Sequence, residues 1–86
     1  MRIDVFLKLT GIFRTRSSAG KAASAGYVSM DGRKLKSSHS VGRGDVLHIV
    51  KPDGTAFSIR VEEIPENRQV SRRDRQEYFT ILGDPD

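Results

Sequence analysis

The apolar residues near the start of the chain repeat with the period of an α-helix. Ile3, Phe6 and Leu7 fall on one side of a helical cylinder, and polar residues occupy the rest of it. The pattern runs from Arg2 to about Ile12 and predicts a first helix that stops near Gly11. Its polar side is free to carry charge.

An alanine-rich run over residues 19–25 predicts a second, short helix. Ser17 or a neighbour suits its N-cap, and Gly26 suits the left-handed position after its last turn. Phe13, in the turn between the two helices, is expected to be a core residue. Because alanine has little side-chain bulk, this helix can pack closely on its neighbours.

After Gly26 the apolar residues alternate with a period of two, which indicates β-strands. The strand-like segments are 27–30, 33–36, 46–50 and 57–61, with hairpin turns at residues 31–32 and 52–54. Two helices followed by several strands predict an α+β domain, in which two short N-terminal helices pack on a small antiparallel sheet.

The segment 65–86 is predicted to be a charged C-terminal extension of a domain that covers residues 1–64. Residues 68–75 fit either a solvated helix or a flexible arm. An apolar cluster at residues 78–82 indicates that the extension docks back onto the domain. The last four residues, 83–86, are expected to be disordered.

Composition narrows the possible classes of protein. A chain of 86 residues with 36% apolar residues makes one domain with a small core. The absence of cysteine excludes disulfide frameworks, thiolate metal sites and thiol catalysis. No long apolar run follows the N-terminus, so a soluble, cytoplasmic protein without a signal peptide or membrane span is expected.

Charge is distributed unevenly along the chain. Residues 1–51 hold ten Lys and Arg against three acidic residues, a net charge of +7. Residues 52–86 hold five against eight, a net charge of −3. Such a field favours a polyanionic partner for the first part of the chain, and the alternative is a basic surface that only confers solubility.

The basic residues that could contact a polyanion gather on the two helices and the hairpin after them. If the second helix begins near Ser17, its free amide groups and dipole lie among arginines and make a phosphate site. The candidate contact residues are Arg2, Lys8, Arg14, Arg16, Ser17, Lys21, Arg33, Lys34 and Lys36.

Two of these assignments have structural alternatives. Arg2 could instead form an ion pair with Asp4 or Asp45. The basic residues of the hairpin, at positions 33–36, could instead protect an edge strand against aggregation.

Catalytic and metal sites are weakly supported. His39 and His48 have neither a cysteine nor a pair of carboxylates near them in sequence, so they make a poor metal site or general base. Ser17 and Ser18 are expected to act as helix caps and not as nucleophiles, because no base is placed to activate them. Neither a cofactor nor enzymatic activity is expected.

Several short motifs follow one another in fixed order. They are Arg2-Ile3-Asp4, Phe6-Leu7-Lys8, Arg14-x-Arg16-Ser17-x-Ala19, Gly26-x-Val28, Asp31-Gly32 and Gly44-Asp45. In this order and spacing they resemble the S-four type RNA-binding domain, also called the alpha-L RNA-binding motif. The short length and the segment at residues 78–82 are similar to one branch of that family, which holds heat-shock protein fifteen and the P-site factor of ribosome-associated quality control.

The resemblance implies a function on the ribosome. Proteins of that branch bind large ribosomal subunits stalled with peptidyl-tRNA and help a factor that extends the nascent chain. The implied partners are therefore ribosomal RNA of the large subunit, peptidyl-tRNA and a nascent-chain tailing factor. The chain itself is expected to be a monomer. The implied RNA contacts are Arg2, Lys8 and Arg16, with Ser17 at the helix start.

The chain departs from the family pattern at three positions. Gly11 and Thr15 stand where many relatives have a basic residue. The lysine usual in the second helix would fall on Gly20, whereas Lys21 is next along, about 100° further round the helix. These departures predict either weaker RNA affinity or compensation by other basic residues.

Two further functions fit the sequence. One is a detached RNA-guide domain of an rRNA-modifying enzyme, and the other is a protein-interaction module that uses the cluster at residues 78–82. A DNA-binding helix-turn-helix is compatible with the positive charge. The second helix argues against it, because this helix is poor in polar side chains able to reach base edges.

Overall fold

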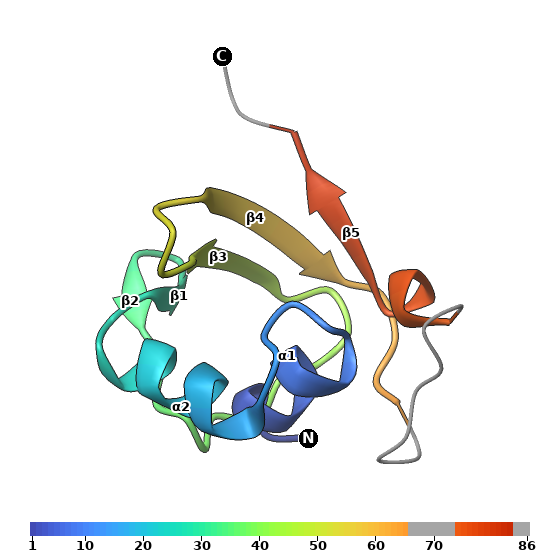
Figure 1. Cartoon of the computed structure of the whole chain (residues 1–86). Coiled ribbons are helices and arrows are strands. Elements are labelled where there is room, and N and C mark those ends of the chain that lie inside the picture. The colour runs from blue at the N-terminus through green and yellow to red at the C-terminus, as the bar shows by residue number, and fades with distance from the viewer. Residues whose placement is uncertain (66–73, 84–86) are drawn as a thin grey trace.

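The computed structural model describes residues 1–65 and 74–83 (Figure 1). In chain order the elements are α1 (Ile3–Leu9), α2 (Arg16–Ser24), β1 (Val28–Met30), β2 (Arg33–Lys34), β3 (Val46–Val50), β4 (Ala56–Val61), the 3-10 turn η1 (Arg75–Glu77) and β5 (Phe79–Leu82). The strands form a five-stranded antiparallel sheet in the order β2-β1-β3-β4-β5. Both helices lie on one side of it (Figure 1), so the predicted α+β fold is confirmed.

Each helix is followed by a glycine in the left-handed conformation, which suits the position after the last helical turn. Gly11 has a φ of +78° directly after the last turn of α1, and Gly26 has a φ of +88° after α2. The N-cap of α2 is Thr15, whose hydroxyl accepts the Ser18 amide at 3.0 Å while the Ser18 hydroxyl accepts the Thr15 amide at 3.2 Å. Ser17 is therefore not the cap, because the helix begins one residue before it, at Arg16.

The hairpin between β1 and β2 closes through Asp31 and Gly32, which both have positive φ values, 53° and 77°. These angles match the two-residue turn that suits twisted antiparallel strands. Strand β2 is only two residues long, and Leu35 then buries its side chain while its amide donates to the Val28 carbonyl at 3.1 Å.

The core lies between the helices and the sheet. Helix α1 contributes Ile3, Phe6 and Leu7 with no exposed surface, and Phe13 from the following turn is buried as predicted. The strands contribute Val28, Leu47, Ile49, Ile59 and Val61. Alternation along β3 and β4 turns these residues toward the helices.

The C-terminal segment joins the sheet. Strand β5 pairs antiparallel with β4, with Phe79 opposite Val61, and both Tyr78 and Phe79 pack against the core. The predicted docking of this segment is therefore confirmed, whereas Ile81 stays 63% exposed. The expectations for residues 68–73 and 84–86 lie outside the described residues. The boundary after residue 64 stays a prediction, and β5 continues the sheet beyond it.

Within residues 1–65 and 74–83, no helix is long and apolar enough to cross a membrane.

Candidate nucleic-acid interface

Asp4 lies in the first turn of α1 with only 4% of its surface exposed. Arg2 donates from Nε to its Oδ1 at 3.2 Å and from Nη2 to its Oδ2 at 3.1 Å. Arg16, the first residue of α2, donates from Nε to the same Oδ2 at 3.3 Å. One carboxylate therefore fixes two guanidinium groups, and Arg2 and Arg16 are called the arginine pair below.

The charge state of Asp4 follows from these contacts. Burial alone raises the pKa of its carboxyl, but the hydrogen bonds from Arg2, Arg16 and the Val5 amide outweigh burial and hold the pKa below its ordinary value. Asp4 is therefore ionised at neutral pH. The cluster keeps a net positive charge, because two guanidinium groups face one carboxylate, and the side chains of Arg2 and Arg16 remain 46% and 49% exposed.

The backbone around Arg2 is held by the loop that precedes β3. The Ile3 amide donates to the His39 carbonyl at 2.7 Å, and the Met1 carbonyl accepts from the Val41 amide at 2.9 Å. Arg2 itself forms a β-bridge with Ser40. Asp45, the other acid considered for Arg2, instead accepts the Gly42 amide at 2.8 Å.

Helix α2 approaches α1 closely through Gly20. A Cβ atom built on Gly20 would lie 3.9 Å from Asp4 Oδ2 and 3.7 Å from the Cβ of Ser37. The small residues of α2 thus allow Arg16 to reach a carboxylate on the neighbouring helix.

Lys8 and Arg14 lie beside the arginine pair. Lys8 follows Asp4 by four residues on α1, so the two share one side of that helix. Arg14 is exposed in the turn before α2 and lines the same hollow as Lys8. The junction of the two helices therefore gathers Arg2, Lys8, Arg14 and Arg16.

Comparison with known proteins matches this arrangement to a family. The family model described as the S4 domain matches residues 1–47. The chain belongs to the S4 domain family. The match spans both helices and the β1–β2 hairpin, which is the region that carries every candidate contact residue predicted from the sequence.

Three relatives extend the likeness over most of the chain. The RQC P-site tRNA stabilizing factor of Bacillus subtilis (strain 168) is 29% identical over 82 residues, which cover 95% of this chain and 92% of that protein. The trimeric structure of Vibrio cholerae heat shock protein 15 has a TM-score of 0.85 at 24% identity, over 95% of this chain and 81% of that one. The solution structure of a hypothetical protein, HP1423, has a TM-score of 0.80 at 28% identity, over 99% of this chain and 100% of that one. The family assignment made from the motifs is confirmed.

The structure does not bring all candidates of this S4 domain together. Lys21 follows Arg16 by five residues and lines a separate, mostly apolar groove with Tyr27 and Pro52. Arg33 and Lys34 are exposed on the hairpin. Lys36 adjoins Ser37, whose carbonyl accepts the Asp4 amide at 3.4 Å, so this end of the hairpin segment lies next to the arginine pair.

The expected phosphate site at the start of the second helix is altered. The Ser18 amide donates to the Thr15 hydroxyl and is not available to a phosphate. The amides of Arg16 and Ser17, in the first turn of the helix, have no intrahelical acceptor and are the remaining donors. Ser17 is exposed there as a residue of the first turn, so its hydroxyl is free of a capping role.

Sequence reasoning missed two basic residues of this region. Lys51 comes from the turn after β3 and Arg75 from η1, and both line the hollow that also contains Lys8 and Arg14. They lie outside the matched S4 region, and nothing in the local sequence connects them with it.

His39 contributes to this region through its backbone carbonyl, which accepts the Ile3 amide at 2.7 Å. His48 is exposed on β3, with Nδ1 at 3.2 Å from the Ser58 hydroxyl on β4. Among residues 1–65 and 74–83 there is no group of three potential metal ligands.

Proposed function

We propose that this S4 domain is a non-catalytic adaptor that binds structured ribosomal RNA of the large subunit. The observation that carries the proposal is the arginine pair, in which Asp4 holds guanidinium groups from two elements in one fixed array. A guanidinium group offers several donors in a rigid fork, which suits the oxygens of a phosphate. About half of each arginine side chain remains accessible to such a ligand.

The geometry favours shape recognition over reading of bases. Base edges of an RNA helix lie in a deep, narrow groove, so a rigid basic surface contacts its backbone instead. The junction of α1 and α2 offers cations on short helices, and its described aromatic residues Phe6 and Phe13 are buried in the core. A platform for stacked single-stranded bases would need exposed aromatic side chains.

The relatives support a role in rescue of stalled nascent chains. The Bacillus subtilis relative is named for the P-site tRNA, and this chain matches 92% of its length. We extend the proposal to contact with peptidyl-tRNA and cooperation with a nascent-chain tailing factor in the cytoplasm. We propose that the chain acts as a monomer, although the Vibrio cholerae neighbour is described as trimeric.

Sedimentation with ribosomes tests this function. Large subunits, with and without induced stalling, are mixed with the wild-type protein, Arg16→Ala and Arg60→Ala, and separated on sucrose gradients. Arg60 is a matched control, because it is 48% exposed and paired with Glu62, as Arg16 is 49% exposed and paired with Asp4. Loss of Arg16 is expected to weaken association by about 1–3 kcal/mol, the scale of a charged hydrogen bond left unmade.

Other results would redirect the proposal. Normal association of a folded Arg16→Ala protein would remove the arginine pair from the interface. Binding to protein partners that survives nuclease treatment, without binding to ribosomes, would favour a protein-interaction module. Copurification with an RNA-modifying enzyme would favour a detached guide domain.

A further inference from the structure

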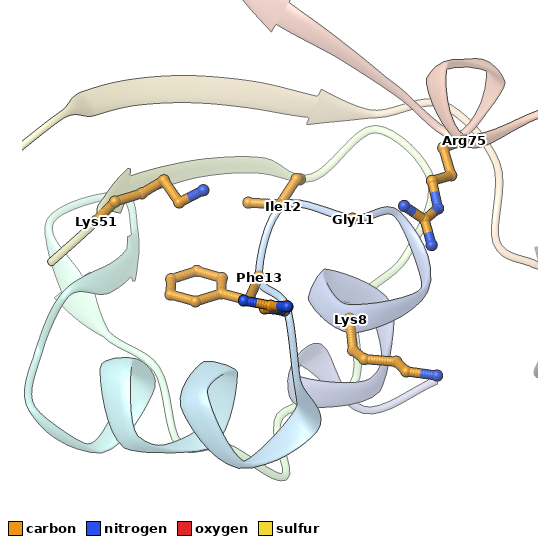
Figure 2. Close-up of a pocket in the computed structure, with 7 residues that line it drawn as sticks. Lys8, Gly11, Ile12, Phe13, Lys51 and Arg75 are labelled. Atoms are coloured by element: carbon orange, nitrogen blue, oxygen red, sulfur yellow. The ribbon is translucent and has the colours of Figure 1, made fainter. Parts of the chain in front are cut away.

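We propose that a second basic site on this S4 domain holds a backbone phosphate of the same bound RNA, and that the C-terminal segment supplies part of it. This inference rests on the proposed function. The site, called the basic pocket below, consists of Lys8, Arg14, Lys51 and Arg75. They line a hollow of about 310 Å³ together with Gly11, Ile12 and Phe13 (Figure 2). Since a water molecule takes about 30 Å³ of liquid volume, the hollow has room for a phosphate group.

The basic pocket concentrates charge of one sign. Its lining contains four cationic side chains and no carboxylate, and they come from the end of α1, the turn before α2, the turn after β3, and η1. Within residues 1–65 and 74–83, none of the four forms an ion pair with an acidic residue. Gathered like charges favour an anion between them, because it relieves their mutual repulsion.

Arg75 is positioned by Gly11. A Cβ atom on Gly11 would lie only 2.8 Å from Arg75 Nη1 and 3.2 Å from Arg75 Cδ, so the missing side chain leaves the space that the guanidinium group fills. Figure 2 shows this side chain reaching from η1 toward the turn that ends α1. Its Nε atom is buried and finds no acceptor in the described part of the chain. An unmade hydrogen bond of this kind is costly, and an anion in the hollow would offset part of that cost by pairing with the charge of the guanidinium group.

Lys51 is held on another side of the hollow. Its Nζ lies 5.8 Å from the centroid of the Phe13 ring, a distance that allows attraction between the cation and the ring face. Its backbone is fixed by the β3–β4 turn, where the Lys51 amide donates to the Thr55 carbonyl at 2.8 Å. The ammonium group is therefore positioned without a direct ion pair, and the Asp53 carboxylate attracts it from a longer distance.

Continuity with the arginine pair points to RNA as the source of the phosphate. Lys8 belongs to the basic pocket, and one helical turn before it Asp4 holds Arg2 and Arg16. One turn of helix is about 5.4 Å long, so a strand that crosses α1 can reach both sites. A free phosphate ion bound in the basic pocket would make no contact with the arginine pair.

Filter binding of ribosomal RNA over a series of salt concentrations tests the basic pocket. Arg75→Ala and Lys51→Ala are each expected to weaken binding about tenfold and to reduce the slope of log affinity against log salt by about one. Arg75→Lys keeps the charge and is expected to lose less. Arg60→Ala is expected to stay within about twofold of the wild type, because a distant exposed charge is screened.

The design separates the outcomes. Lys51→Ala leaves the C-terminal segment unchanged, so it still tests the pocket if Arg75→Ala fails to fold in thermal melts. Wild-type affinity in both variants, with weakened binding in Arg16→Ala, would overturn the basic pocket and leave the proposed function in place. Unaltered binding in Arg16→Ala as well would overturn the basic pocket and remove the arginine pair from the interface, and failure of the wild type to bind would overturn the proposed function. Titration with inorganic phosphate tests whether the pocket binds the free ion instead of RNA. If both variants lost phosphate binding but kept the RNA affinity of the wild type, the inference would also be overturned.

Discussion

Asp4 Oδ2 and Arg16 Nε lie 3.3 Å apart, although the two residues are separated by twelve positions in the sequence. The same carboxylate also accepts two hydrogen bonds from Arg2. The placement of both arginines therefore depends on one buried acid. An acidic residue in the middle of a surface proposed to bind a polyanion is a positioning device, and this role can be separated from attraction by charge.

Replacing Asp4 with asparagine separates positioning from charge. The Asp4→Asn substitution raises the net charge by one, so simple attraction predicts tighter RNA binding. Loss of the charged hydrogen bonds to Arg2 and Arg16 predicts the opposite for structured RNA. We expect weaker binding to ribosomal RNA by about 1–2 kcal/mol, measured by filter binding at fixed salt.

A flexible single-stranded RNA serves as the comparison for Asp4→Asn. It needs no fixed array, so its affinity is expected to stay equal or to rise with the added charge. If structured RNA were also bound more tightly, positioning by Asp4 would be refuted.

Acid stability provides a second prediction. The pKa of Asp4 is lower in the folded chain than in the unfolded chain, where a carboxyl titrates near pH 3.9. Its contribution to stability is therefore fully present above about pH 5, and is lost as the pH falls through the unfolded pKa toward the lower folded one. We expect the free energy of unfolding to fall more steeply with acid in the wild type than in Asp4→Asn, measured by urea unfolding.

Other carboxyls do not obscure that comparison. Asp53 and Glu62 also have lowered pKa values, through the Thr55 amide and the Arg60 guanidinium respectively. Both residues are present in the two proteins, so their contributions cancel in the difference. Parallel acid profiles would show that Asp4 adds no pH-dependent stability.

Gly20 offers a gain-of-function test. A Cβ at this position meets Ser37 and Asp4 only at ordinary contact distances. Because glycine within a helix costs about 0.5–1 kcal/mol relative to alanine, Gly20→Ala is expected to raise the free energy of unfolding by up to that amount. Gly20→Lys adds a cation beside the arginine pair and is expected to tighten RNA binding, with Gly20→Ala as its control. Equal affinity of the two variants would contradict this prediction.

Truncation tests the role of the C-terminal segment. A chain that ends at Ile64 lacks β5, which pairs with β4, and lacks Tyr78 and Phe79, which pack against the core. We expect a loss of about 2–4 kcal/mol in the free energy of unfolding, from buried apolar surface and unmade hydrogen bonds. Chemical denaturation measures it, and a chain that ends at Gly83 is the control. Equal midpoints would mean that residues 1–64 are sufficient for the fold.

Local signals in the sequence predicted most of the fold. The helical stripe of Ile3, Phe6 and Leu7 became the buried side of α1, and Gly26 took the left-handed conformation after α2. The N-cap, expected at Ser17 or a neighbour, is Thr15, because two residues before Ser17 a reciprocal cap with Ser18 is available. Pairing of β5 with β4 was not foreseen as a strand, because an apolar cluster does not specify a register.

The candidate site was only partly predictable for a related reason. Motifs identified the arginines, since these lie within the matched S4 region. That Asp4 would join Arg2 to Arg16 depends on how closely α2 approaches α1, and the contribution of Arg75 depends on the path of the chain after β4. Contacts of that kind arise from packing between distant segments, and no local pattern encodes them.

The anchoring of the first residues affects how the protein can be labelled. The Met1 carbonyl is bonded to the Val41 amide and Arg2 bridges to Ser40, so the amino end lies inside the proposed RNA surface. A purification tag or fluorophore fused ahead of Met1 would emerge beside Arg2 and obstruct a large ligand. Strand β5 runs away from the helices (Figure 1), which makes its far end the better point of attachment.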